Sequence, residues 1–364
     1  MKLKSFDTID NLTRAQQLMI RACLAIVKEE REHAVHDWED EVLIDDLDFS
    51  SSRLIPYFFY GNQQHGIISR HDKRLKVIYK HWWLRTQHIS HQLKKVEGAL
   101  FEAGIDAVII KGASIKMHYE REELRPMADF DLLVKPSDLQ NALQIVKNLD
   151  YLPHEPSEFV LQKSTNLFLD FNHAISCAHK KNDTHIDLHW RVGSRCSMRF
   201  SDDLWLHLEN YSGLTHARRP QLAYEVFMLI IHAVNYGNRD NLNWIIDIAV
   251  INIKADRSFW KEARALAVAE KKEDLFDYGC SVLIKFGVYA PDPGSVKKPR
   301  ALISIDPDYG QQMSYMKLTY TRIWNLITSV NRLLPHAKVS DKLYQSIRYT
   351  RFVLIRRNAR SIKS

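Results

Sequence analysis

The sequence of 364 residues lacks any apolar run of about 18 residues, the length that a membrane-spanning helix requires. Its first residues, MKLKSFDTIDNL, contain no apolar core followed by small residues, so we expect no signal peptide. Cysteine is scarce, and none of the cysteines has the CxxC spacing of a zinc site or a disulfide scaffold. The four residues are Cys23, Cys177, Cys196 and Cys280. These absences are typical of a cytoplasmic protein with reduced thiols.

Acidic residues are missing from the end of the chain. After Asp341 there is no Asp or Glu, and the bases there account for the whole formal net charge of +7. These bases are Lys342, Arg348, Arg351, Arg356, Arg357, Arg360 and Lys363. Because the rest of the chain is close to neutral, a basic body that tracks nucleic acid is not indicated. The tail is a candidate contact for an anionic partner or a membrane surface, and a solvated helix end is the alternative.

Hydrophobic periodicity divides the chain into three regions. Apolar residues at three- and four-residue spacing predict helices in residues 1–104 and again in residues 201–364. Between them, residues 105–200 have the pattern of strand, helix, strand, helix and two further strands. This order predicts an α+β fold, in which a small mixed β-sheet core is inserted between helical N-terminal and C-terminal regions.

Two carboxylates occur at alternate positions in the apolar segment DFDLLV. On a strand, Asp129 and Asp131 would point to the same face. Carboxylates so close together repel each other unless a proton or a cation lies between them. Mg²⁺ prefers carboxylate oxygens and keeps coordination positions for phosphate oxygens, so the pair predicts a site for Mg²⁺ or Mn²⁺.

A later segment, HIDLHW, supplies further candidates. His185, Asp187 and His189 would share one face of a strand, while the other face is apolar. If this strand neighbours DFDLLV, Asp187 completes a three-carboxylate metal site. His189 is a candidate for orienting Asp187 or approaching a substrate, and a hydrogen-bonded structural histidine is the alternative.

A third segment lies upstream, where the predicted strand DAVII runs into the turn KGAS and a predicted helix. A helix N-terminus favours phosphate, and Gly112 would let the backbone come close to it. Lys111 would add a cation and Ser114 a hydroxyl. Arg125 is a candidate for a forked contact with another phosphate oxygen, and pairing with a nearby acid is the alternative.

Together these segments resemble a known family. The order strand, KGAS, helix and RxxxDFDLLV, followed later by HIDLHW, is similar to an uncharacterised bacterial nucleotidyltransferase family of the polymerase-β-like superfamily. RLIPYFFYGNQQHG resembles the helical N-terminal segment of that family, and NWIIDIAVI resembles its later helix, so the resemblance covers most of residues 50–270. One departure is the turn, because Ala113 stands between Gly112 and Ser114 where the superfamily has Gly-Ser or Gly-Gly.

The resemblance implies a polymerase-β-like core that moves a nucleoside monophosphate from an NTP to an acceptor and releases pyrophosphate. It implies a two-metal mechanism, with metal-binding and catalytic roles for Asp129, Asp131 and Asp187. The residues expected to contact the nucleotide are Lys111, Gly112, Ser114, Arg125 and His189. The acceptor is not indicated, and a sugar, a peptide, a protein or an RNA end all remain open.

Other functions also remain open at this point. A metal-dependent hydrolase would account for HIDLHW but would need more ligands, commonly another histidine pair. A non-catalytic nucleotide-binding module on the same fold is a second alternative, and a toxin-like transferase acting on tRNA is a third. Asp247 and His232 lie in predicted C-terminal helices. For each, contact with the nucleotide or acceptor stands beside a purely structural role, such as a buried cap or a salt bridge.

Overall fold

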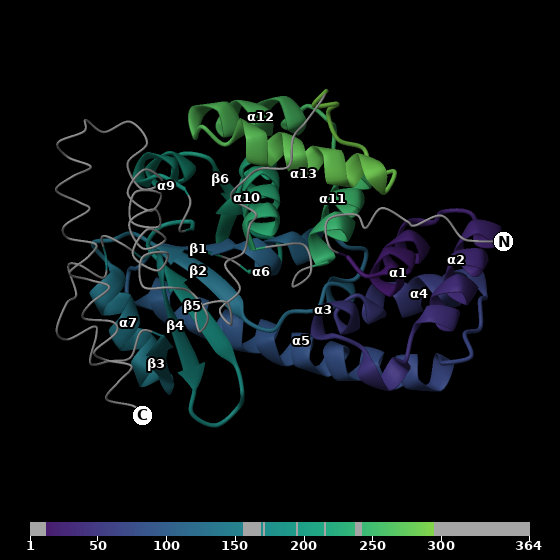
Figure 1. Cartoon of the computed structure of the whole chain (residues 1–364). Coiled ribbons are helices and arrows are strands. Elements are labelled where there is room, and N and C mark those ends of the chain that lie inside the picture. The colour runs from purple at the N-terminus through teal and green to yellow at the C-terminus, as the bar shows by residue number, and fades with distance from the viewer. Residues whose placement is uncertain are drawn as a thin grey trace, which may run out of the picture. The chain divides into compact units, whose positions relative to one another are not determined.

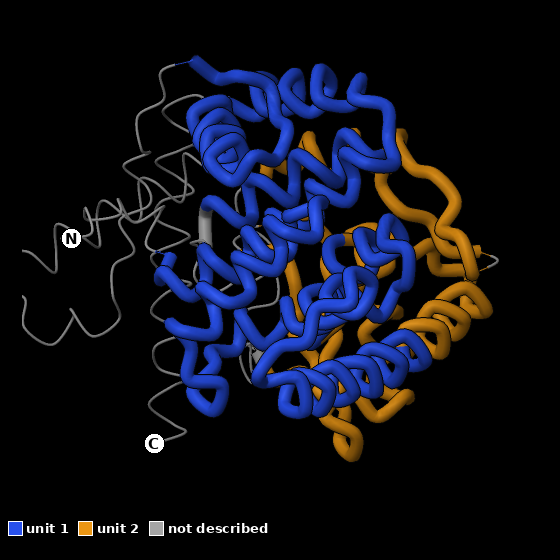
Figure 2. Tube along the Cα trace, turned by 90° about the vertical axis from the view of Figure 1, so that its right-hand side faces the viewer, with its two compact units in different colours: residues 1–92, 111–128, 222–302 blue, residues 93–110, 129–221, 303–364 orange. Residues whose placement is uncertain are grey.

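The computed structural model describes residues 12–155, 169, 172–193, 196–214, 216–236 and 242–294. They form helices and a mixed β-sheet, which confirms the predicted α+β fold (Figure 1). The chain divides into two compact units (Figure 2). Unit 1 comprises the described parts of residues 1–92, 111–128 and 222–302, and unit 2 those of residues 93–110 and 129–221. The basic tail lies outside the described residues.

Unit 1 is helical. Its longer helices are α1 (Arg14–Leu24), α2 (Lys28–Glu41), α4 (Ile55–His65), the part of α5 (Asp72–Glu102) up to Gln92, α10 (Leu222–Tyr236), α11 (Asn243–Lys254), α12 (Phe259–Ala269) and α13 (Glu273–Lys285). Its short helices are η2 (Ile44–Asp46), α3 (Phe49–Ser52), α6 (Lys111–Ile115), η3 (Lys116–His118) and η4 (Glu122–Leu124).

Helix α10 is a buried helix of unit 1. Its sequence, LAYEVFMLIIHAVNY, is apolar on all sides, and helices of this kind are buried in a core. It packs against α6, α11, α12 and α13. Phe227 and Ile230 are completely buried, and each such side chain contributes about 1.5–3 kcal/mol of transfer free energy. Glu225 is an acid within this apolar helix and is also buried.

The segment 111–128 differs from the single helix expected after KGAS. It forms three short helical turns, α6, η3 and η4, and the extended backbone at Tyr119, with ψ of 152°, separates η3 from η4. Because the three turns do not share one helix axis, their side chains point in different directions. The segment packs on α10 and α11, where two buried carboxylates are found.

Among the described residues, unit 2 is built on a seven-stranded mixed sheet with the order β3-β4-β5-β2-β1-β7-β6. The strands are β1 (Ala107–Ile110), β2 (Phe130–Val134), β3 (Tyr151–Glu155), β4 (Ala174–His179), β5 (His185–His189), β6 (Leu208–Asn210) and β7 (Arg218–Pro220). The pairs β2–β5 and β1–β7 are parallel, and the other neighbours are antiparallel. Helix α7 (Leu139–Asn148) packs on β3, and α9 (Met198–Leu204) precedes β6.

Strand β2 lies inside the sheet, and all five of its residues are buried. Strands covered on both faces have nearly continuous apolar sequences, and FDLLV fits this pattern except for Asp131. Parallel pairing with β5 aligns Phe130 with Ile186 and Asp131 with Asp187. The core strand therefore carries one acid whose nearest neighbour across the sheet is another acid.

Three strands were not predicted from the sequence. Strand β3 contains Pro153, which cannot donate a ladder hydrogen bond, and it is tolerated because β3 lies at the edge of the sheet. Strands β6 and β7 have three residues each, too few for a recognisable alternation. Within the described part of the chain, no helix combines the length and apolar character that crossing a membrane requires.

Candidate active site

Asp131 and Asp187 lie opposite each other on the parallel strands β2 and β5. Register partners in adjacent strands point to the same face, so the two carboxylates are neighbours. Asp131 is 5% exposed, and Asp187 is half-buried. The expectation that the HIDLHW strand neighbours DFDLLV is confirmed.

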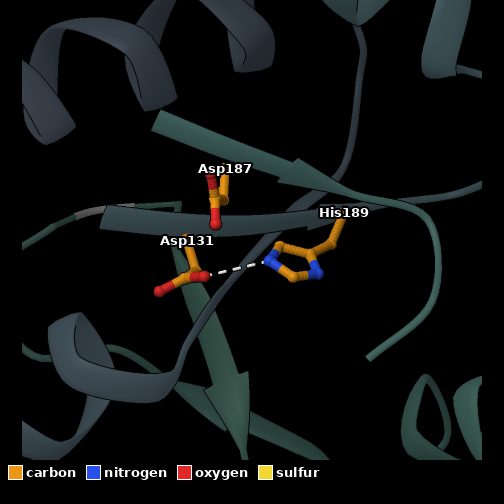
Figure 3. Close-up of side chains that lie close together, drawn as sticks. All are labelled: Asp131, Asp187 and His189. Atoms are coloured by element: carbon orange, nitrogen blue, oxygen red, sulfur yellow. Dashed lines mark hydrogen bonds and ion pairs between the residues drawn. The ribbon is translucent and has the colours of Figure 1, made fainter. Parts of the chain in front are cut away.

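His189 completes the cluster from the end of β5. It is completely buried, and its Nε2 lies 2.9 Å from Oδ1 of Asp131 (Figure 3). One ligand atom from each of Asp131, Asp187 and His189 lies within 4.8 Å of the other two. Two carboxylates and an imidazole at this separation are able to share a divalent cation, and the donor set fits the metal that the sequence predicts.

Strand β4 orients Asp187. Ser176 is the register partner of Asp187 on that strand, and its hydroxyl donates a hydrogen bond to Oδ1 of Asp187. A carboxylate held by one oxygen has its plane restricted, while Oδ2 is left for a ligand or a proton. No feature of the sequence indicated this role of Ser176, because it depends on the pairing of β4 with β5.

Asp129 lies directly before β2 and is exposed. It is not a member of the cluster of Asp131, Asp187 and His189 in the residues that the structure describes. It precedes Asp131 by two positions, so one further residue of extended backbone would direct it to the same face. Its role as a metal ligand stays a prediction.

Lys111 is the first residue of α6 and has a φ of +53°. This left-handed conformation is uncommon for residues other than glycine and costs roughly 1–2 kcal/mol. Such strain clusters at functional sites. In the chain Lys111 directly follows Ile110, which is the register partner of Asp131. The predicted phosphate contact of Lys111 stays a prediction.

Gly112 lies against Arg125 within unit 1. A Cβ atom at position 112 would stand 2.5 Å from Nη1 of Arg125, closer than real Cβ contacts allow. The sequence predicted that the missing side chain would admit a phosphate. The close approach found in the structure is to a guanidinium.

Arg125 forms a buried ion pair with Asp247 on α11. Its Nε and Nη2 lie 3.2 and 3.0 Å from the two carboxylate oxygens of Asp247, a forked geometry. Tyr119 donates its hydroxyl to the same carboxylate at 2.6 Å. Burial, together with the Asp247 charge, raises the pKa of Tyr119 well above its usual value, so the phenol remains a donor. The salt-bridge interpretation of Asp247 is confirmed, and the predicted phosphate contact of Arg125 stays a prediction.

Glu225 on α10 is a second buried carboxylate that binds side chains of segment 111–128. The hydroxyl of Ser114 donates to its Oε1, and Nε2 of His118 lies 3.0 Å from its Oε2. Ser114 is completely buried, and its hydroxyl is hydrogen-bonded to Glu225. His118, Tyr119 and Glu225 were not singled out from the sequence. A usable signal was present in Glu225, an acid within an otherwise apolar helix, the same signal that drew attention to Asp247.

The remaining histidine candidates lie outside the cluster. His185 shares a face of β5 with Asp187, but its ring makes an edge-to-face contact with His154, with 5.5 Å between centroids. Among the described residues, the candidate metal cluster therefore holds one histidine, whereas the hydrolase interpretation needs more. His232 is half-buried on α10, and its role stays a prediction.

Comparison with known proteins adds the family to this geometry. A family model described as uncharacterised nucleotidyltransferase matches residues 49–283, more than half of the chain. The matched range includes the KGAS turn, Arg125, the strands β2 and β5 of the candidate site, and Asp247. No curated protein matches the chain. The family match supports nucleotidyl transfer as the general activity, with an NTP as a substrate. The chain belongs to the uncharacterised nucleotidyltransferase family.

Proposed function

We propose that this protein is a metal-dependent enzyme that transfers a nucleoside monophosphate from an NTP to an acceptor and releases pyrophosphate. The observation that carries the proposal is the register pairing of Asp131 with Asp187, in a chain of a nucleotidyltransferase family. Two acids on adjacent inner strands are costly to bury together unless a cation neutralises them.

The proposed metal ligands are Asp131 and Asp187, joined by Asp129 as a third carboxylate. When bound, Mg²⁺ or Mn²⁺ would neutralise charge on the triphosphate and on the group that leaves. We assign to Lys111 the neutralisation of a further part of the triphosphate charge. Its position next to Ile110, the register partner of Asp131, supports this assignment.

The proposed reaction is an in-line displacement. A hydroxyl oxygen of the acceptor bonds to the α-phosphorus of the NTP. The bond from the α-phosphorus to the α,β-bridging oxygen breaks, and pyrophosphate leaves with that electron pair. Asp187 takes the acceptor proton, and the Ser176 hydrogen bond to Oδ1 leaves Oδ2 to receive it. Catalysis rests mainly on positioning and charge neutralisation.

For Ser114 and Arg125, we propose a structural role in place of the predicted nucleotide contact. Their polar groups already bind Glu225 and Asp247, so we assign them to holding segment 111–128 in place. This segment begins with Lys111. The backbone at Gly112 is retained as a candidate phosphate contact.

We also propose a cytoplasmic location. All four cysteines are free and buried, which suits a reducing compartment. An anionic partner of the basic tail remains a prediction that concerns residues outside the described range.

Pyrophosphate release tests the proposed function. Each of the four common NTPs is incubated with Mg²⁺ or Mn²⁺ and with a panel of sugar phosphates, peptides, protein and RNA. We expect release with the wild type and a loss of about 1,000-fold or more in Asp131→Asn and Asp187→Asn. Asp183→Asn is the matched control, because Asp183 is an exposed acid in the turn before β5.

Two results would replace this proposal with an alternative. Tight NTP binding without pyrophosphate release for any acceptor would identify a binding module. Release of inorganic phosphate supported by Zn²⁺, without pyrophosphate, would identify a hydrolase.

A further inference from the structure

The orientation of His189 restricts what lies between its ring and Asp131. Nδ1 of His189 lies 3.1 Å from the carbonyl oxygen of Arg191. A carbonyl oxygen only accepts hydrogen bonds, so Nδ1 carries the hydrogen. In the neutral ring, Nε2 then presents a lone pair to Oδ1 of Asp131, 2.9 Å away. Two lone pairs at this distance repel each other unless a proton or a metal ion lies between them.

The carbonyl that orients His189 is itself held in place. Arg191 is 2% exposed, and its guanidinium donates to the carbonyl oxygens of Asn172 and Leu169 at 3.1 and 3.2 Å. Rotating the His189 ring would break the contact with a fixed backbone carbonyl. A histidine that donates one ring N–H to a backbone carbonyl and aims the other nitrogen at carboxylates has the usual surroundings of a metal ligand.

We propose that His189 binds the divalent cation of this site directly through Nε2, beside Asp131 and Asp187. The presence of the cation rests on the proposed function, whereas the nitrogen ligand goes beyond it. Mg²⁺ prefers oxygen donors, and imidazole suits transition-metal ions better. His189 therefore shifts the preference of the site from Mg²⁺ toward a transition-metal ion such as Mn²⁺, relative to a site built from carboxylates alone.

Pulsed electron paramagnetic resonance of bound Mn²⁺ tests the nitrogen ligand without any measurement of activity. The full chain is loaded with one equivalent of Mn²⁺ in the presence of an α,β-methylene NTP. We expect a nitrogen hyperfine coupling that changes when the histidines carry ¹⁵N. The coupling should vanish in His189→Gln, with a Kd for Mn²⁺ at least about tenfold higher. His185→Gln, which alters another histidine on the same face of β5, should retain both the coupling and the Kd.

Metal selectivity provides a second measurement. In His189→Asp, the ratio of the Mg²⁺ Kd to the Mn²⁺ Kd should fall by about tenfold, because an oxygen donor in place of the imidazole nitrogen suits Mg²⁺. Thermal melting of each variant shows whether it is folded. If the variants at position 189 do not fold, the ¹⁵N effect in the wild type still shows whether a histidine nitrogen binds Mn²⁺.

The outcomes separate this inference from the function on which it rests. Mn²⁺ bound in a manner that Asp187→Asn abolishes, but without nitrogen coupling, would overturn the inference and leave the proposed function standing. His189 would then be a charged hydrogen-bond donor to Asp131. Nitrogen coupling without pyrophosphate release would support the inference and contradict the proposed function. No stoichiometric Mn²⁺ binding would overturn both.

Discussion

Gly112 and Arg125 touch at a point where no side chain other than hydrogen fits. A Cβ at position 112 would lie 2.5 Å from Nη1 of Arg125. The guanidinium cannot easily retreat, because Asp247 holds it through two hydrogen bonds in a buried site. Glycine at this position is therefore explained by packing within unit 1, before any contact with a nucleotide is considered.

Gly112→Ala should destabilise the protein by about 1–3 kcal/mol, because the added methyl group overpacks the site and displaces Arg125. Chemical denaturation measures this change. Gly98→Ala is the control, since a Cβ there meets nothing within 4 Å in helix α5 and should stabilise by up to about 1 kcal/mol. Equal effects of the two substitutions would contradict the packing explanation.

Asp247→Ala should cost about 3–5 kcal/mol, because it leaves the Arg125 guanidinium charged and buried without its carboxylate. Arg264→Ala removes one partner of a more exposed pair with Asp277 in the same unit and should cost less than about 1 kcal/mol. Denaturation of both variants measures the difference. The double variant Arg125→Leu/Asp247→Leu is a third sample, in which neither charge of the pair remains. A cost for Asp247→Ala no larger than that for Arg264→Ala would show that the pair is unimportant for stability.

Substitutions of Lys111 distinguish the effect of its backbone conformation on stability from the effect of its ammonium group on activity. Because φ is +53°, Lys111→Gly should be about 1 kcal/mol more stable than Lys111→Ala. Both variants should lose about 100-fold or more in kcat/KM for pyrophosphate release if the ammonium group contacts the triphosphate. Lys271, at φ of +54° and exposed, is the matched control. Lys271→Gly should be more stable than Lys271→Ala to a similar extent, and both should keep full activity. Retained activity in Lys111→Gly would exclude the phosphate contact.

Cys23 should make stability depend on alkaline pH. Burial raises its pKa from 9.0 to about 12, an effect that the nearby Arg31 only partly offsets. The folded state thus keeps the proton that the unfolded state releases above pH 9, so stability falls as pH rises from 9 toward 12. Between pH 7 and pH 10 this thiol accounts for a loss of about 1.4 kcal/mol.

Urea denaturation at both pH values measures that loss. In Cys23→Ala the fall in unfolding free energy should be smaller than in the wild type by that amount. Ile20→Val, a core truncation on the same helix α1, should keep the wild-type pH dependence. An unchanged slope in Cys23→Ala would show that the thiol ionises normally in the folded protein.

Much of the candidate site follows from local alternation. The apolar segments around Asp131 and Asp187 predict strands, and the two-residue period places His189 on the same face as Asp187. The buried ion pair of Asp247 was one of two interpretations of an acid in an apolar helix, and it is found. The position of Asp129 outside β2 was not predictable, because the end of a strand depends on its pairing with segments far away along the chain.

The sequence alone determined the strands around Asp131 and Asp187, the face on which these acids lie and the family to which the pattern is similar. These features depend on neighbours a few positions away, which the chain order contains directly. Only the tertiary structure decided that β5 pairs in parallel with β2, that Ser176 orients Asp187 and that Arg191 orients His189. It also decided that Ser114 and Arg125 bind Glu225 and Asp247. Buried polar groups take whichever partners the packing brings to them, and these partners lie far away along the chain.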